Sequence, residues 1–276
     1  MAIAIGDIRF RNPRLWQRVS TLLWARRAVW VFAPLTLWVL LTRFACVPCV
    51  VAGAVFTLIL VKALGAWEQS LRRQFVRDAA LPRFLVDKLI EAYPQLKAGD
   101  AELVLRGLRQ FFLAHLRSGR QFVGMPSKLV DTAWHEFILH TRAYENWCTS
   151  AFGSLLHHTP AEALGGSSAK RNDGLRRTWY WTCKEESIDP RNPTRLPLLF
   201  ALDKKFDIPG GFRYEANCHS LNRGAGFNTY CGSDFGGGGD SGGAAGDADG
   251  FGGSESTSSG DGGGSDGGGC GGGGGD

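Results

Sequence analysis

The feature that most constrains the fold is an apolar stretch near the N-terminus. Residues 28–42 read AVWVFAPLTLWVLLT and residues 44–61 read FACVPCVVAGAVFTLILV, with only Arg43 between them. As one helix, these roughly 34 residues would be about 51 Å long, well beyond a hydrocarbon core of about 30 Å. The stretch therefore predicts either a single span over residues 44–61 after an interfacial segment, or a tight hairpin with Arg43 near its turn.

Basic residues flank this stretch on both sides, and basic flanks favour the cytosolic face of a membrane. Basic residues on both sides therefore suit the hairpin, with both of its ends in the cytosol, and an anionic lipid bilayer is the expected first partner. A signal peptide is not expected, because the basic region before the apolar run is too long. The flanking residues are Arg9, Arg11, Arg14, Arg18, Arg26 and Arg27 before the stretch, and Lys62, Arg72, Arg73 and Arg77 after it.

The composition divides the chain into four regions. Residues 1–27 form a basic N-terminal segment, residues 28–62 the transmembrane region, residues 66–232 a soluble domain and residues 233–276 a tail rich in Gly, Asp and Ser. The tail has almost no apolar residues to bury, so it is predicted to be a disordered acidic linker. A nucleic-acid partner is not expected, because the tail lacks the arginines of RGG segments.

Seven cysteines at irregular spacing predict reduced thiols, and hence a cytosolic domain. Cys46 and Cys49 resemble a redox CxxC pair, but within an apolar run they are interpreted as small packing residues.

The domain reads as helices. Apolar residues recur at helical spacing over 66–118, and residues 127–153 read as one long helix. A loop over 156–173, a helix near 174–187, a Pro-rich link, a short helix over 195–206 and an extended closing segment over 208–221 follow. Because no other alternating strand pattern is present, the predicted fold class is all-α, with the membrane segment before the domain and the disordered tail after it.

The long helix contains the sequence HEFILH. A zinc protease needs two histidines four residues apart, whereas His135 and His140 are five apart and face different directions on a helix. A protease is therefore excluded by this spacing. Asp131 lies one turn before His135, at a spacing that favours contact and that orients catalytic or metal-bound histidines. The same pair could simply stabilise the helix.

A metal site would need ligands from other parts of the chain. The candidates are His135, His157, His158 and Cys183, and zinc is the transition metal that suits them. No CxxC or CxxH spacing joins them. The sequence HHTP also has a structural interpretation, in which Thr159 caps a helix beginning at Pro160.

The stretch VDTAWHEFILHTRAYENWC, with LHHTP, RTWYWTCKEESIDP and the glycine tail, resembles the uncharacterised glycine-rich domain-containing protein-like family. The resemblance implies an all-helical cytosolic domain in a bacterial inner-membrane protein, and it implies no established reaction. Phe137 departs from the family pattern, which has a second histidine there. The matching positions are Asp131, Trp134, His135, Ile138, Leu139, Tyr144 and Cys148.

Two functions fit these observations. The first is a membrane-anchored module that binds a protein partner through its helical domain or its tail. The alternative is a metal-dependent or acid–base enzyme centred on the helix with Asp131 and His135. Under either, the candidate functional residues are Asp131, Trp134, His135, Tyr144 and Cys148.

Overall fold

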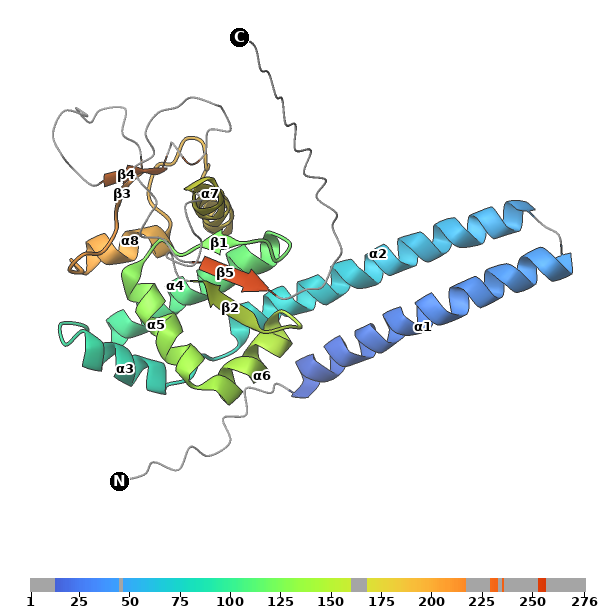
Figure 1. Ribbon diagram of the computed structural model, residues 1–276, viewed down its shortest axis with the longest axis horizontal. Helices are drawn as coiled ribbons and strands as arrows, with labels where there is room; N and C mark the ends of the chain where they lie inside the picture. Colours follow the sequence, from blue (N-terminus) through green and yellow to red (C-terminus); the bar gives the residue numbers. More distant parts are fainter. Residues whose placement is uncertain are drawn as a thin grey trace, which may run out of the picture.

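The computed structural model describes residues 13–44, 47–159, 168–216, 229–232, 235 and 253–256. Its described part is mostly helical, in agreement with the sequence. Figure 1 shows a domain of short helices from which two long helices project.

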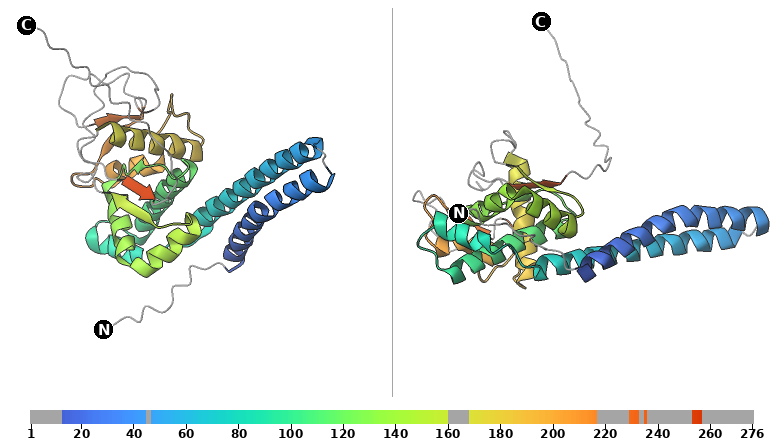
Figure 2. Two further views of the ribbon diagram at one scale, coloured as in Figure 1. Left: turned by 45° about the vertical axis from the view of Figure 1, so that its right-hand side comes forward. Right: turned by 90° about the horizontal axis from the view of Figure 1, so that it is seen from below.

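The two projecting helices are α1 (Pro13–Phe44) and α2 (Val47–Asp78), each of 32 residues. They run antiparallel to one another, as both views of Figure 2 show. Leu22 of α1 packs with Leu71 of α2, and Arg26 lies 3.4 Å from Glu68. The chain therefore forms a helical hairpin whose α1 ends one residue after Arg43, where the sequence places the turn.

The far part of the hairpin exposes large apolar side chains, among them Phe32, Trp38, Val55, Phe56 and Ile59. Of the helices within the described residues, α2 alone is long and apolar enough to cross a membrane by length and composition. The last turns of α2 differ, because Phe75 and Val76 are buried in the core of the domain. The hairpin is thus continuous with the domain through α2.

Arg72 fastens the root of the hairpin to the domain. Its Nε donates to Glu68 Oε1 over 2.9 Å, and its Nη1 donates to the backbone oxygens of Thr149 and Ser150. These carbonyls belong to the last turn of α6 (Thr141–Ala151), where a helix leaves acceptors without partners inside the helix. A buried cation therefore satisfies both a carboxylate and a helix end.

The domain is built around α4 (Ala98–Arg117), which runs through its centre (Figure 1). Rings of Phe111 and Phe112 on α4 lie against Trp134 and Trp147 at centroid distances of 4.6–6.2 Å. Such tilted and edge-to-face contacts suit the ring quadrupoles. Around α4 lie α3 (Phe84–Ala92), α5 (Lys128–Leu139), α6, α7 (Ser168–Glu185) and α8 (Leu198–Lys205).

The predicted single helix over 127–153 is wrong, because the chain breaks at His140 into α5 and α6. His140 has φ −88° and ψ 61°, which is outside the helical region. Its ring stacks on Phe84 of α3 with centroids 3.8 Å apart, and its Nδ1 contacts the Glu136 carbonyl oxygen. Helical spacing cannot reveal this break, because the apolar pattern continues on both sides.

Short strands add to the helices, so the finer prediction of an all-α domain needs correction. An antiparallel sheet has the order β1 (Val123–Gly124), β5 (Gly253–Ser256), β2 (Leu156–Thr159). A parallel pair joins β3 (Arg213–Glu215) and β4 (Thr229–Cys231). Thr159 ends β2, where the sequence predicts a helix cap, and residues 160–167 lie outside the described part.

Two described parts of the predicted tail differ from the expected disorder. Phe235 packs on the rings of Trp179, Phe200 and Tyr214, with centroids 5.9–6.3 Å apart. Residues 253–256 form β5. Pairing through the backbone needs no apolar side chain, which is why the composition of the tail gives no sign of this strand.

The four cysteines within the described residues fall into two classes. Cys148 and Cys183 are free and buried, whereas Cys49 and Cys231 are disulfide-bonded. The prediction of reduced thiols, and of Cys49 as a packing residue, is therefore wrong for the latter two. Reduced thiols accordingly no longer support a cytosolic position of the domain.

Candidate functional site

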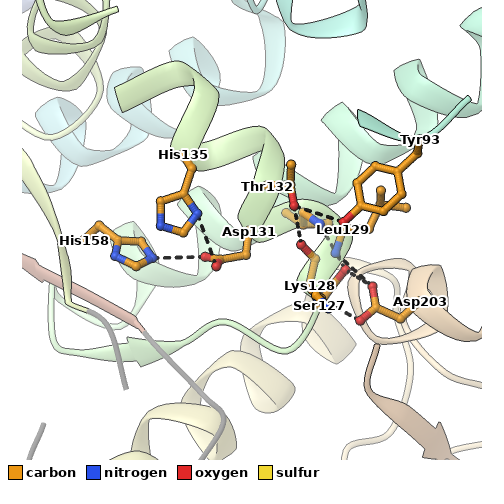
Figure 3. A network of polar contacts seen from close by, with 10 residues as sticks. Tyr93, Ser127, Lys128, Leu129, Asp131, Thr132, His135, His158 and Asp203 are labelled. Carbon is orange, nitrogen blue, oxygen red and sulfur yellow. Dashed lines mark hydrogen bonds and ion pairs between the residues drawn. The ribbon is translucent and has the colours of Figure 1, made fainter. Parts of the chain in front are cut away.

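The site begins at the N-terminus of α5, which is held by an unusually complete set of hydrogen bonds. The Ser127 hydroxyl accepts from the Val130 N–H and donates to Asp203 Oδ1 over 2.6 Å. The buried Asp203 carboxylate also accepts from the backbone N–H groups of Lys128 and Leu129. Helix N-termini leave such donors without partners, so Asp203 of α8 fixes the first turn of α5 (Figure 3).

Asp131 lies in the same first turn of α5 and contacts two histidines. Its Oδ2 is 3.4 Å from His135 Nδ1, four residues along the same helix. Its Oδ1 is 3.1 Å from Nε2 of His158, which comes from β2. The two imidazole rings face one another at a centroid distance of 4.3 Å, as Figure 3 shows. One carboxylate therefore lies between two imidazoles from separate elements.

The three side chains differ in their access to solvent. His158 is nearly buried, with 12% of its side chain exposed, and its ring lies 4.7 Å from that of the buried Trp134. His135 is half exposed at 51%. The cluster is therefore buried on the side of His158 and open to water on the side of His135.

Three further residues of the same sequence stretch hold β2 in place. The Trp134 Nε1–H donates to the Tyr144 hydroxyl over 3.0 Å, and that hydroxyl donates to the Leu156 carbonyl over 2.6 Å. The buried Cys148 thiol lies at the same place, beside Leu156 and Tyr144. Leu156 is two residues before His158, so this buried network positions the histidine-bearing strand.

The convergence of ligand atoms suits a metal ion. Among the described residues, the group whose possible ligand atoms all lie within 4.8 Å of one another is Asp131, His135 and His158. A tetrahedral site with metal–ligand distances of about 2.0–2.1 Å has edges of about 3.3 Å. The two Asp–His separations, 3.1 Å to Oδ1 and 3.4 Å to Oδ2, are close to this length and involve different oxygens of the Asp131 carboxylate.

The structure does not bring the other two metal candidates into this cluster. His157 is exposed on β2, and adjacent side chains of a strand point to opposite faces. Cys183 is buried on α7, and burial raises the pKa of its thiol to about 12. Burial likewise raises the pKa of the Cys148 thiol to about 12. A thiol binds metal as the thiolate, so neither is poised as a ligand.

The sequence predicts every member of the cluster as a candidate, together with Trp134, Tyr144 and Cys148 of its support, but it does not predict Asp203 or the Leu156 carbonyl. Asp203 was not considered, although an acid among the apolar residues of ALDKKF is a sign of a buried carboxylate that needs donors. The carbonyl of Leu156 leaves no mark in the sequence, because any residue supplies one.

Comparison with known proteins identifies a family to which most of the chain is similar. A family model described as UCP032817-like matches residues 71–235, which include the root of the hairpin, the whole helical domain and every residue of the cluster. Neither the curated proteins nor the solved structures give a match. The family model does not test the resemblance to the glycine-rich domain-containing protein-like family, which stays a prediction. Since the matched residues are more than half of the chain, the protein belongs to the UCP032817-like family.

Proposed function

We propose that the protein is a membrane-anchored domain that binds a divalent transition-metal ion through Asp131, His135 and His158. The observation that carries the proposal is the convergence of three ligand atoms, from α5 and β2, within 4.8 Å. His158 lies 23 or more positions along the chain from Asp131 and His135, so it is the fold that brings the three residues together. This favours the metal-dependent alternative over a binding module without a metal.

Two imidazoles and one carboxylate suit Zn²⁺, and the same set also binds Fe²⁺. Structural zinc sites are closed by four protein ligands, whereas sites with three leave a position for water or another small ligand. The half-exposed His135 supports an open position of this kind. Such an ion would supply Lewis acidity or an activated water, and with either the protein would act as a metal-dependent enzyme.

The test is a zinc titration of the full chain in detergent, in competition with a fluorescent chelator. We expect one site in the parent protein, and a loss of at least a hundredfold in affinity in His135→Ala and His158→Ala. The matched controls are His157→Ala, next to His158 on β2, and Cys183→Ser on α7, both of which should bind like the parent. Equal affinity in all five proteins, or no binding in any, would refute the metal site and leave a binding module without metal.

The dimensions of the hairpin support membrane anchoring. Trp24 and Trp67 are exposed, and each lies within two residues of the contact between Arg26 and Glu68. From each tryptophan to the turn there are about 20 residues, or about 30 Å of helix, which equals the thickness of a hydrocarbon core. Tryptophans at that depth match the aromatic belt of membrane proteins, and the neighbouring basic residues Arg26, Arg27 and Lys62 suit lipid headgroups.

Anchoring is tested by alkaline extraction of membranes from cells that make the full chain. Phe56 and Ile59 are 66% and 62% exposed, so replacing both by Asp costs little packing in the hairpin. In the middle of a bilayer each Asp costs roughly 3 kcal/mol, so this variant should appear in the soluble fraction. Leu139→Asp, at a 71% exposed position on the domain, is the control and should stay in the membrane. Retention of the double variant would contradict anchoring by the hairpin.

We further propose the cytoplasmic face of a bacterial inner membrane for the domain, because basic residues flank both arms of the hairpin. The disulfide at Cys231 argues against this location, because disulfides persist in oxidising compartments. Reporter proteins fused to the C-terminus distinguish a cytoplasmic from a periplasmic domain. If the domain is cytoplasmic, a fused fluorescent protein should be bright and a fused alkaline phosphatase should be inactive. The reverse pattern would assign the domain to the periplasm.

A further inference from the structure

The histidine-bearing strand β2 pairs with a strand from the far end of the chain. In the three-stranded sheet, β5 lies in the middle, and the described part of the structure gives β1 and β2 no other strand partner. Ser254 of β5 pairs with Val123 of β1 and with His158 of β2. Figure 1 shows β5 between them on the surface of the domain. A segment of the glycine-rich tail thus adjoins a proposed metal ligand.

The two outer strands are held by the domain independently of β5. The backbone of Gly124 approaches that of Gly174 and Leu175 so closely that a Cβ at Gly124 would meet the Leu175 nitrogen at 3.0 Å. The Thr178 hydroxyl also donates to the Gly124 carbonyl over 2.7 Å. Strand β1 is therefore fixed to α7, while β2 is fixed at Leu156 by Tyr144. Between them lies a slot that one extended strand fills.

The end of β2 that carries His158 has fewer supports. The Tyr144 hydroxyl holds the strand at Leu156, its first residue, and Asp131 contacts the ring of His158. The ring of His158 also lies against those of Trp134 and His135, whereas the backbone of residues 157–159 is held by its pairing with β5. Removing β5 would leave His158 on an edge with unpaired backbone groups, which favours several conformations over one.

We propose that the slot between β1 and β2 is a docking site for residues 253–256 of the chain's own tail, and that docking holds His158 in place for metal binding. This inference rests on the proposed metal function. The glycine at position 253 pairs with Gly124 and Thr159, so two of the three strands have no Cβ at this level of the sheet. By linkage, a docked tail that raises metal affinity must itself be stabilised by the metal.

The tail of the same molecule is favoured over that of a second copy. Phe235 is held on the domain by Trp179, which leaves fewer than 20 residues between it and Gly253. A covalent connection of fewer than 20 residues gives an effective concentration in the millimolar range. A second copy would have to exceed that concentration to replace the strand.

The experiment uses the full chain in detergent and three variants. Ser254→Pro removes a backbone donor and places a proline in a middle strand, which sheets do not tolerate. Ser254→Ala keeps the donor, and Ser258→Pro places the same residue beyond β5. The readouts are hydrogen exchange of residues 156–159 without metal, and zinc affinity. We expect Ser254→Pro to speed exchange at least tenfold and weaken zinc binding about tenfold, with both controls near the parent.

The two readouts separate the ways in which the proposal can fail. Unchanged exchange in Ser254→Pro would overturn docking of the tail. Faster exchange with unchanged zinc affinity would overturn the coupling between the tail and His158. If the parent binds no zinc, the proposed function fails and the coupling with it, while the exchange measurement still decides whether the tail docks.

Discussion

The hydroxyl of Tyr144 is a single atom on which the geometry of the site depends, and Tyr144→Phe removes it without changing the ring. Tyr144 is buried, and its hydroxyl both accepts from Trp134 and donates to the Leu156 carbonyl. Each such bond contributes about 1 kcal/mol, and the stranded indole N–H of Trp134 adds about 1–2 kcal/mol of uncompensated desolvation. We therefore expect the free energy of unfolding to fall by roughly 3 kcal/mol.

A second effect should appear at the metal site. Because the Leu156 carbonyl loses its strongest donor, β2 becomes less ordered two residues before His158. Supporting residues of metal ligands typically contribute 10–100-fold to affinity, so zinc binding should weaken by at least tenfold at a temperature where the variant is fully folded.

The assay is denaturant unfolding of the full chain followed by near-ultraviolet circular dichroism, with zinc competition on the same preparations. Tyr180→Phe is the matched control, since Tyr180 lies on the exposed face of α7. Its unfolding free energy and zinc affinity should equal those of the parent. A loss below about 0.5 kcal/mol in Tyr144→Phe, or a loss equal to that of the control, would refute the reasoning that this hydroxyl carries the network.

Three other predictions follow from single contacts. Burial lowers the pKa of His115 to about 4. Below about pH 6.5 the unfolded chain therefore binds a proton that the folded chain does not, and the free energy of unfolding should fall by up to about 3 kcal/mol between pH 6.5 and pH 4. His115→Gln should flatten this fall when unfolding is measured as a function of pH. Gly174→Ala should lower the melting temperature, because its Cβ would lie 2.4 Å from the ring of Phe122; unchanged melting would contradict this. Asp203→Ala should destabilise by about 3 kcal/mol in denaturant unfolding, because the backbone N–H groups that its carboxylate accepts from lose their partner. The control Asp173→Ala, at an exposed position on α7, should stay within about 0.5 kcal/mol of the parent.

The sequence predicted most helices, because each has apolar residues at helical spacing on one face. The hairpin was one of two stated options, and Arg43 marked its turn. The break at His140 was missed because it depends on contact with Phe84, which lies more than 50 residues away. Tertiary packing of this kind overrides local periodicity.

The sequence predicts which types of residue form the cluster, but not which of the two adjacent histidines belongs to it. The pair Asp131–His135 follows from helical spacing alone. The choice of His158 over its neighbour His157 depends on which face of β2 points inward, and two adjacent histidines carry no such information in sequence. The strand itself was missed, because its partner β5 is nearly 100 residues away in a segment whose composition predicts disorder.

X-ray absorption at the zinc edge, on the full chain loaded with one equivalent of zinc, tests the central claim most directly. The account predicts nitrogen and oxygen ligands at about 2.0–2.2 Å, with the signature of two imidazoles, and no sulfur. His158→Ala should lose one imidazole from this spectrum, whereas His157→Ala should leave it unchanged. A sulfur shell at about 2.3 Å, or an imidazole signature that persists without His135 and His158, would contradict the claim that Asp131, His135 and His158 form the metal site.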